Sequence, residues 1–505
     1  MYDENCIITL PVIDEIEINV FKEFMKTSYE IKQGYAVTER LVELAKEHFT
    51  FYAIRSEQTT ELWVFSEGIY VPYGKSTLRE FCRYMCGEKY RQSVSEEVIA
   101  KMEADTYIDS NIFFNKKIPN LIPVKNGLLN LETKMLEPFN SEYILFNKVP
   151  VVYDPTATCP AIHKFFMDIA ASEKDIQTFY ELFGYCLYKD SFIEKAVMLL
   201  GNGRNGKTKF LSLLRQMLGE SNTSEISLNR IEVDKFSVHV MMNKLANLAG
   251  DISKKRIEDS SIFKELVGRD KISTARKFRE DIEFESYAKQ IFATNNLPQI
   301  DDSTDGFWTK WVLLSFPNKF VPIKEMSKVL KDTPVEKRQY IKEMNPHILR
   351  DIIKPSEMSG LLNKSLEGLH NLLENKSFTS SQSSKDIERM WIRESSSFAA
   401  FAYDNIEKRA NYYITSSEMA SAYADYCDLT SLGIESPKDI SHVMNSLFNS
   451  TKELKRMNED TDRMWANVKF KNESGVTSNL KNTIFVSRPP IQRGDDDDGR
   501  QTVLG

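Results

Sequence analysis

Long apolar runs and clustered cysteines are both missing from this sequence of 505 residues. No stretch reaches the roughly 18 apolar residues that a membrane span requires, and no apolar segment near the N-terminus resembles a secretion signal. The six cysteines are scattered, and Cys82 and Cys86 lie one helical turn apart without a second ligand pair nearby. This pattern argues against a zinc site and a disulfide framework, and it predicts a reduced intracellular compartment.

An excess of positive charge is also missing, because the formal net charge is −7. A globally basic nucleic-acid-binding chain is therefore excluded, and any such contact must come from a local patch. Apolar residues make up 41% of the chain, which is enough for ordinary hydrophobic cores. At roughly 150 residues per domain, the length predicts about three domains.

The strongest pattern in the chain is a glycine-rich stretch of the form G-x-x-x-x-G-K-T. It comprises Gly201, Asn202, Gly203, Arg204, Asn205, Gly206, Lys207 and Thr208. The apolar run 196–200 before it is typical of a buried parallel strand, and residues 209–218 after it have helical apolar spacing. This context predicts a phosphate-binding loop. Its N–H groups would surround the phosphates of ATP, Lys207 would reach the β- and γ-phosphates, and Thr208 would hold Mg²⁺.

Two polar residues that end later apolar runs fit the same site. Asp251 ends the run 244–251, about 40 residues after the loop, and its carboxylate would bind Mg²⁺ at the carboxyl edge of the sheet. Asn295 follows the run 290–294 and would reach the γ-phosphate or its attacking water. The alternative is a turn asparagine at a strand end. Three later aromatic residues are predicted core residues rather than base-stacking ones: Phe307, Trp308 and Trp311.

A basic segment lies between these two polar residues. Residues 263–279 predict a helix, a turn and a hairpin whose basic and aromatic residues are Arg276, Lys277, Phe278 and Arg279. The acids Glu280, Asp281, Glu283 and Glu285 dilute this charge. From the residues alone, DNA contact and a solvated surface hairpin are both open.

The rest of the chain predicts a domain order. Residues 1–172 are expected to form an N-terminal α+β accessory domain, with a strand pair in 62–71 and a hairpin at Asn126-Gly127. An α/β core follows in 173–376. After a serine-rich linker at 377–385, helices and a hairpin within 377–490 predict a winged-helix-like domain, and 491–505 predict a disordered acidic tail. The winged-helix-like domain would read DNA in the major groove or serve as a packing or partner-binding domain.

The order of the motifs resembles that of the superfamily 3 DNA helicases, and more closely the poxvirus primase–helicase-like branch of phages, plasmids and other mobile elements. The glycine loop and the acidic strand are followed by K-E-L-x-G-x-D at 264–270, A-T-N-x-x-P at 293–298 and F-W-x-K-W at 307–311. Upstream, I-P-x-x-N-G-x-x-N at 122–130 is similar to the N-terminal domain of that branch. The resemblance covers about residues 40–375, and it implies a P-loop AAA+-type ATPase core.

The resemblance assigns roles residue by residue. It implies that Asp251 is the Walker B acid, that Asn295 is the sensor asparagine, and that Lys277 and Phe278 belong to a hairpin that grips DNA in a central channel. Two positions depart from the family. Lys310 stands where the family has an arginine finger, so either Lys310 or a cation such as Arg276 or Arg279 would serve. Gly250 precedes Asp251, which leaves a single acid, and the water-activating base stays open between candidates such as Glu258 and Asp259.

The resemblance implies an ATP-dependent replicative DNA helicase and initiator of a mobile genetic element. Such a protein would use ATP and Mg²⁺, assemble as a homohexameric ring, and act on single-stranded, forked and replication-origin DNA in the host cell cytoplasm. A separate primase or host replication proteins would be its partners. No D-x-D metal pair or zinc cluster occurs in the first forty residues, so we expect unwinding without primer synthesis. The alternative function is an ATP-switched origin-binding factor that recruits a host helicase without unwinding DNA itself.

Overall fold

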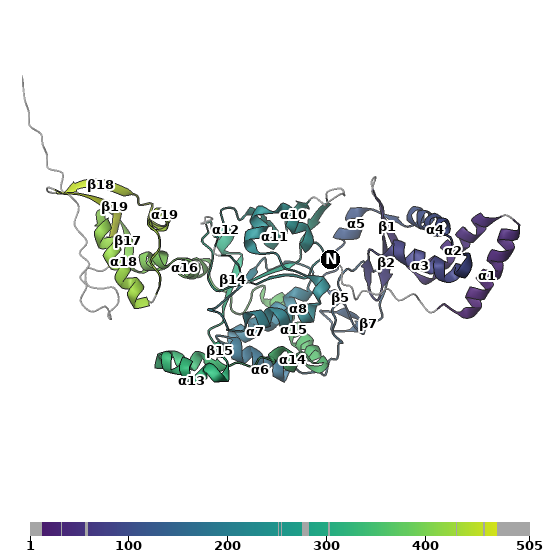
Figure 1. The fold of residues 1–505 in the computed structure, drawn as a ribbon, viewed down its shortest axis with the longest axis horizontal. Coiled ribbons are helices and arrows are strands. Elements are labelled where there is room, and N and C mark those ends of the chain that lie inside the picture. Colours follow the sequence, from purple (N-terminus) through teal and green to yellow (C-terminus); the bar gives the residue numbers. More distant parts are fainter. Residues whose placement is uncertain are drawn as a thin grey trace, which may run out of the picture. The chain divides into compact units, whose positions relative to one another are not determined.

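The structure is a computed structural model, and it describes residues 13–31, 33–55, 59–250, 252–253, 255–274, 282–300, 304–430, 432–457 and 460–471. Its chain forms a mixed α/β protein with two compact units (Figure 1). The first unit comprises Met1–Asn296 and Ile300–Ser384, and the second comprises Leu297–Gln299 and Lys385–Gly505. Asp251, Arg276, Lys277, Phe278 and Arg279 lie outside the described residues, as does the predicted acidic tail at 491–505.

The N-terminal part of the first unit packs helices against a small sheet. The helices are α1 (Glu15–Glu30), α2 (Gly34–His48), α3 (Gly74–Cys86), α4 (Gln92–Asp105) and α5 (Ser110–Asn115), with the 3₁₀ turn η1 (Gly87–Lys89). The strands β1 (Phe51–Ile54), β2 (Glu61–Ser66), β3 (Ile69–Val71) and β4 (Tyr107–Ile108) pair in the order β3-β2-β1-β4. The predicted strand pair in 62–71 is confirmed. The helix α1 has no sequence motif, yet Asp14 caps its first turn and Phe21 and Met25 are buried.

A second small sheet joins this part to the central sheet. It holds β5 (Leu121–Val124), β6 (Gly127–Asn130) and β7 (Leu136–Glu137), and β5 and β6 form the hairpin predicted at Asn126-Gly127. The apolar residues of 149–153 predict one more short strand, but this segment is not in a strand. The Val149 N–H donates to the Pro123 oxygen, and the Val151 oxygen accepts from the Lys125 N–H. The helix α6 (Pro160–Ile169) follows. Residues from β5, β6 and α6 share one hydrophobic core with the central sheet, so that core continues across residue 172.

A parallel sheet of five strands forms the centre of the first unit. The strands are β8 (Ala196–Leu200), β9 (Thr223–Ser224), β10 (Ala246–Ala249), β13 (Lys289–Thr294) and β14 (Trp311–Ser315), in the order β14-β8-β13-β10-β9. All residues of β8, β10 and β13 are buried, as expected for parallel strands that are covered on both faces. The predicted strands around the glycine loop, before Asp251 and before Asn295 are thereby confirmed.

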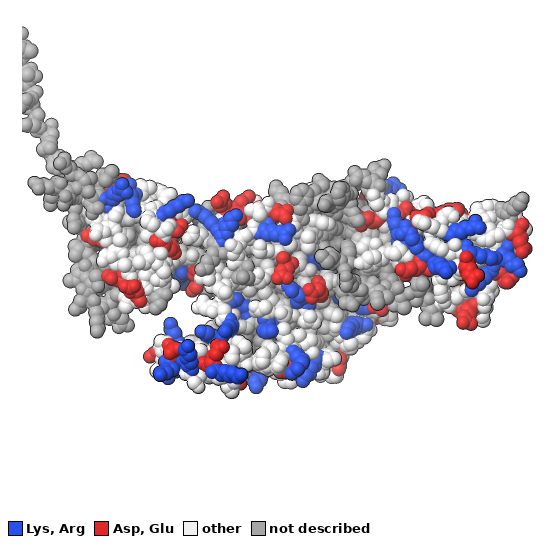
Figure 2. All heavy atoms as spheres, viewed as in Figure 1, with Lys and Arg blue, Asp and Glu red and all other residues white. Residues whose placement is uncertain are grey.

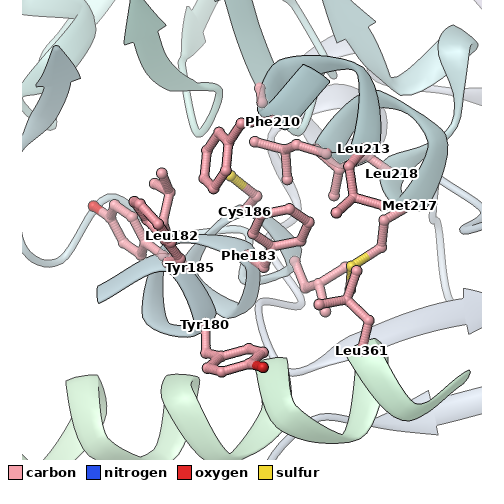
Figure 3. Close-up of a cluster of buried hydrophobic side chains, with 14 of the residues drawn as sticks. Tyr180, Leu182, Phe183, Tyr185, Cys186, Phe210, Leu213, Met217, Leu218 and Leu361 are labelled. Carbon is pink, nitrogen blue, oxygen red and sulfur yellow. The ribbon is translucent and has the colours of Figure 1, made fainter. Parts of the chain in front are cut away.

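Helices cover both faces of this sheet. One face carries α7 (Glu173–Leu187), α8 (Lys207–Leu218) and α15 (Pro355–Asn375), whose apolar side chains meet around Phe183 and Phe210 (Figure 3). The helices α7 and α15 cross so closely that a Cβ atom at Gly184 would lie 2.1 Å from the backbone oxygen of Ser365. On the other face, Phe263 of α11 (Ser261–Val267) stacks on Trp311 with ring centroids 4.7 Å apart. Phe307, Trp308 and Trp311 are buried, so their predicted core role is confirmed.

The remaining elements of the first unit lie in the connections. They are η2 (Glu220–Asn222), α9 (Leu228–Val233), α10 (Lys235–Val238), η3 (His239–Met241), β11 (Lys271–Thr274), β12 (Ile282–Glu285), α12 (Asp305–Trp308), β15 (Lys319–Val321), α13 (Ile323–Asp332), η4 (Val335–Tyr340), β16 (Ile341–Glu343) and α14 (Ile348–Ile352). The strands β11 and β12 form the predicted basic hairpin, whose tip lies outside the described residues. Lys and Arg side chains mix with Asp and Glu side chains over α13 (Figure 2).

The predicted serine-rich linker differs from the structure over its first residues. Phe378 is 3% exposed and belongs to the core of the first unit. The backbone N–H of Thr379 donates to Glu181 at 2.9 Å, and the Gln382 side chain exchanges two hydrogen bonds with the backbone of Leu313. Serine and glutamine side chains are polar enough to resemble a linker, but here their bonds fix the segment to α7 and β14.

The second unit contains helices and an antiparallel sheet. The helices are α16 (Ser384–Ser395), α17 (Ser397–Asn405), α18 (Ser416–Thr430) and α19 (Pro437–Phe448), and the strands β17 (Ile406–Thr415), β18 (Lys452–Met457) and β19 (Asp460–Phe470) pair in the order β17-β19-β18. The sequence Thr415-Ser416-Ser417-Glu418 predicts a capping box at a helix start. The box is present, since the side chains of Glu418 and Thr415 each accept from the other's backbone N–H. Trp465 is buried, as expected. Among the helices in the described ranges, none combines the length and apolar character needed to cross a membrane.

Candidate nucleotide-binding site

The glycine loop connects the end of β8 to the start of α8, in the predicted arrangement. Gly203 and Gly206 have φ values of +75° and +94°, which side chains rarely allow. A Cβ atom at Gly201 would lie 1.8 Å from Nδ2 of Asn205 and 2.7 Å from the backbone oxygen of Phe316. The loop therefore turns tightly enough to direct backbone N–H groups inward at the N-terminus of a helix, where anions are favoured.

Lys207 is the central side chain of this site. Its residue is 6% exposed, and its Nζ atom donates to the backbone oxygen of Gly201 at 2.5 Å, to Oδ1 of Asn205 at 3.1 Å and to Oδ1 of Asn295 at 3.0 Å. The last bond joins residues 88 positions apart in the sequence. The pairing of β13 with β8 causes this meeting, because the parallel strands bring their carboxyl ends to one edge.

An open cavity of about 700 Å³ lies at this edge of the sheet. Its lining comprises Phe165, Asp168, Gly203, Arg204, Asn205, Gly206, Lys207, Thr208, Lys209, Gly250, Ala293, Thr294, Asn295, Phe320, Glu343, Met344, Asn345, Pro346 and Ile348. Cavities that hold small molecules and cofactors usually measure about 300–1,000 Å³. The cavity is therefore large enough for a nucleotide whose phosphates lie in the glycine loop.

One predicted metal ligand, Thr208, lies at this cavity, whereas Asp251 is outside the described residues. Thr208 lines it, and so does Gly250, the residue directly before Asp251. A β-strand that ends beside the loop and is followed by an acid is the arrangement that the sequence predicts for Mg²⁺. The Thr208 hydroxyl and the Asp251 carboxylate would both supply hard oxygen ligands, and Mg²⁺ prefers such ligands. The residue types therefore fit Mg²⁺.

Lys310 lies at the opposite edge of the sheet. It directly precedes β14, and its backbone oxygen accepts a hydrogen bond from the N–H of Ala196, the first residue of β8. Its Nζ atom pairs with the Glu194 carboxylate at 2.5 Å. Ala196 is the first of the five residues of β8, and the glycine loop begins directly after the last one. At about 3.3 Å per residue, the two ends of this strand are roughly 16 Å apart. Lys310 and Lys207 of one chain are therefore not brought together.

Other lysines at this amino edge are buried among carbonyl oxygens. The Nζ atom of Lys289 donates to the backbone oxygens of Tyr188 and Tyr287 at 2.8 and 2.7 Å, and it lies 4.4 Å from the Tyr185 ring centroid. Burial lowers the pKa of Lys289 to about 7. Burial likewise lowers the pKa of Lys189 to about 7. These two ammonium groups are enclosed by protein and do not line the large cavity.

The candidates for a water-activating base are not at the cavity. The backbone N–H groups of Glu258 and Asp259 donate to the carboxylate of Glu232, and Asp259 caps the first turn of α11 through the N–H of Ser261. Neither acid is among the described residues that line the cavity. The contacts of Glu258 and Asp259 are those of a helix start.

Sequence reasoning missed one wall of the cavity. Phe320, Met344, Pro346 and Ile348 come from the connection that follows β14, where no motif is present. The backbone N–H of Phe320 donates to the oxygen of Arg204 at 2.7 Å, and the Arg204 guanidinium pairs with Glu325 of α13 at 2.8 Å. Both contacts depend on the tertiary structure, so a reading of local patterns had no signal for them.

The comparisons with known proteins agree with the predicted resemblance. Residues 38–170 match a family model described as "D5 N terminal like". Residues 199–306, which include the whole glycine loop and Asn295, match a model described as a "Family of unknown function (DUF5906)". Over 254 residues the chain is 25% identical to a protein of Acanthamoeba polyphaga mimivirus, named as the candidate helicase L207/L206. The match spans 48% of this chain and only 26% of that relative.

Among solved structures, the apo C-terminal region of NrS-1 aligns with 85% of this chain and 98% of its own, at 11% identity and a TM-score of 0.42. A second form of that region, residues 305–718, gives a TM-score of 0.40 over the same shares of the two chains. Likeness at this level assigns nothing to the site. The sequence matches, in contrast, cover both the N-terminal region and the loop region. The chain thus carries a D5 N terminal-like region and resembles the D5-like primase–helicase proteins, as its motifs predict.

Proposed function

We propose that the protein is an ATP-dependent DNA helicase of a mobile genetic element. The observation that carries the proposal is the meeting of Lys207 and Asn295 over the glycine loop in a cavity of about 700 Å³. In that position the ammonium group can exchange its protein oxygens for the β- and γ-phosphate oxygens of ATP. The asparagine amide then lies where the γ-phosphate or the attacking water would be.

Magnesium is part of this proposal. Thr208 and Asp251 would hold the ion, which neutralises charge on the phosphate oxygens when it is bound. The strand β10 ends at Ala249, and Gly250, the next residue, lines the cavity, which supports the assignment of Asp251. The AAA+-type assignment of the core is supported by the buried parallel sheet, in which the strand of Asn295 neighbours the strand of the loop.

Assembly of several copies into a ring, a hexamer in our proposal, would give Lys310 a function. Within one chain Lys310 and the glycine loop lie at opposite edges of the sheet. Lys310 could therefore reach the γ-phosphate only of a nucleotide bound to a neighbouring copy, as an arginine finger does when it acts in trans. The Lys310 side chain is 19% exposed, so most of it is covered by its own chain and only part is available to a neighbour.

DNA contact is assigned to the hairpin β11–β12 and to the second unit. Arg276, Lys277, Phe278 and Arg279 follow β11, and their basic and aromatic character suits a single strand. The helices and antiparallel strands of the second unit are of the kinds found in winged-helix domains, which supports a role in origin binding. A partner-binding role for the second unit fits the same elements.

The second candidate function is an ATP-switched origin-binding factor that recruits a host helicase. The ion pair of Lys310 with Glu194 favours it, because a lysine held by its own chain is a weak substitute for an arginine finger. Hydrolysis would then be slow, and ATP would act by binding.

Strand displacement on a forked DNA duplex with ATP and Mg²⁺ separates the two functions. We expect the unaltered protein to displace the strand and Lys207→Ala to fail, while Lys174→Ala, at an exposed position of α7, behaves as the unaltered protein does. If Lys207→Ala still displaces the strand, the site assignment is wrong. If the unaltered protein binds the fork in an ATP-dependent way without displacement, the switch function replaces the helicase.

A further inference from the structure

The cavity at the glycine loop has a second, apolar end. Its lining there comprises Phe165 of α6 and Phe320, Met344, Pro346 and Ile348, which belong to the connection 319–348. We propose that this apolar end is the subsite for the nucleobase of the bound nucleoside triphosphate, and that residues 319–348, called here the base wall, form it. The proposal rests on the proposed function, and it assigns the half of the ligand that the phosphate loop does not explain.

The base wall is attached directly to the phosphate loop. The backbone bond from Phe320 to Arg204 fixes β15 beside the loop. A methyl group added at Gly206 would lie 3.7 Å from the Phe320 ring, so this ring is next to the turn that begins α8. A ligand with phosphates in the loop would therefore extend past Phe320 into the apolar end.

The fold of the wall places its other apolar residues toward the cavity. The strands β15 and β16 pair in parallel, with Phe320 opposite Lys342, and the N–H of Met344 donates to the backbone oxygen of Val321 at 2.9 Å. This pairing returns the chain to the loop after α13 and η4. Met344 and Ile348 line the cavity as a result.

Polar side chains close the wall onto α6. Lys342 pairs with the Asp168 carboxylate at 3.0 Å, and Asn318 Nδ2 donates to the Asp168 backbone oxygen at 2.8 Å. The Asn345 side chain donates to Asp351 and accepts from the N–H of His347, each at 2.9 Å. The polar groups of this part of the wall are thus bonded to other protein groups. The apolar side chains are then the surface that the flat face of a base would contact.

The charged residues that line the cavity favour one orientation of the nucleotide, with its phosphates at the loop and its base at the apolar end. Of its described residues, the acids are Asp168 and Glu343, and both neighbour the apolar residues in sequence: Asp168 on α6 with Phe165, and Glu343 next to Met344. The cations among them are Arg204, Lys207 and Lys209, all at the loop. The cations at the loop therefore attract phosphate, while Glu343 disfavours phosphate beside Met344; the Asp168 charge is compensated by Lys342. An aromatic base has no charge, and contact with apolar side chains removes its faces from water.

Two probes separate the subsite from the phosphate loop: Mg²⁺-ATP and inorganic Mg²⁺-tripolyphosphate, which has no base. Ile348→Ala should weaken ATP binding about tenfold, which corresponds to about 1.4 kcal/mol, and leave tripolyphosphate binding unchanged. The matched control is Leu349→Ala, the next residue of α14, which is also half-buried but does not line the cavity. Met344→Ala should reproduce the effect of Ile348→Ala. Calorimetric titration gives both affinities, and a thermal melt checks that each variant is folded.

Selective loss of ATP affinity in Ile348→Ala and Met344→Ala supports the base subsite. Equal loss for both probes would show that the wall only supports the loop, and the proposal would be overturned. No change for either probe would also overturn it. If the unaltered protein binds neither probe, the proposed ATPase function itself fails, which is a different result from a failure of the subsite alone.

Discussion

The central sheet carries buried lysines both where its parallel strands end (the carboxyl edge) and where they begin (the amino edge). The surroundings of the lysines differ between these two edges. At the carboxyl edge, Lys207 bonds to Gly201, Asn205 and Asn295 and lines a large cavity. At the amino edge, Lys289 bonds to carbonyl oxygens inside the protein, and Lys310 pairs with Glu194. The same side-chain type is therefore poised to exchange partners at one edge and is fixed at the other.

This difference shows that burial of a charge does not by itself indicate a binding site. Burying an ammonium group costs free energy at either edge unless acceptors surround it. At the amino edge the acceptors come from the protein and the lysines stabilise packing. At the carboxyl edge the neighbouring open volume leaves room for phosphate oxygens to replace the protein oxygens, as the proposed ATP binding requires.

The largest expected effect concerns the function of Lys310 in trans. If Lys310 acts as a finger, Lys310→Ala should lower the ATP hydrolysis rate by about a thousandfold, the lower end of the range for arginine fingers. A mixture of inactive Lys207→Ala and Lys310→Ala chains should recover part of the rate, because some interfaces pair an intact loop with an intact Lys310. Steady-state phosphate release measures both.

The control for this experiment is Glu194→Gln, which removes the ion-pair partner but keeps Lys310. It should retain hydrolysis within a few-fold. A mixture without any recovery, together with an equal loss in Glu194→Gln, would mean that Lys310 only stabilises the amino edge.

A smaller effect is expected at Asn295. Asn295→Ala should lower kcat for ATP by about a hundredfold while the affinity for ATP changes little, because the amide acts on the transition state more than on the bound nucleotide. Asn296→Ala, at the next exposed position, is the matched control. A parallel loss of affinity and kcat would instead assign Asn295 to holding Lys207 in place.

The smallest expected effect concerns pH and the amino edge. Burial lowers the pKa of Lys189 to about 7 from an ordinary value of 10.5. Between these pH values the unfolded chain binds a proton that the folded chain lacks, so stability rises as pH rises through this window. In Lys189→Met the rise of the thermal midpoint from pH 7 to pH 9 should be smaller than in the unaltered protein. Lys174→Met should keep the full rise, and an unchanged slope in Lys189→Met would contradict the assignment.

Much of the sheet could be predicted from the sequence, because its strands are continuous apolar runs between turn residues. The glycine loop was predictable for the same reason, since its flanks and its glycines act locally. The hairpin at Asn126-Gly127 and the capping box at Thr415 are similarly local.

Other features depend on contacts between distant residues and had no local signal. The bond of Asn295 to Lys207 needs β13 beside β8, and the apolar base wall needs β16 to return to β15 after α13. The strand β17 was missed because the central charged and polar residues of Ile406–Thr415 hide its apolar ends. The distance between Lys310 and the loop follows from strand direction, which a motif does not state.

The most direct test of the difference between the edges compares Lys207→Met with Lys289→Met. Both changes remove an ammonium group and keep an apolar stem. Mg²⁺-ATP affinity and the thermal midpoint are measured for each. We predict that Lys207→Met loses ATP binding with little change in the midpoint, and that Lys289→Met lowers the midpoint and still binds ATP at temperatures where it is folded. If Lys207→Met binds ATP as the unaltered protein does, Lys207 is a structural lysine and the nucleotide site is not at the glycine loop.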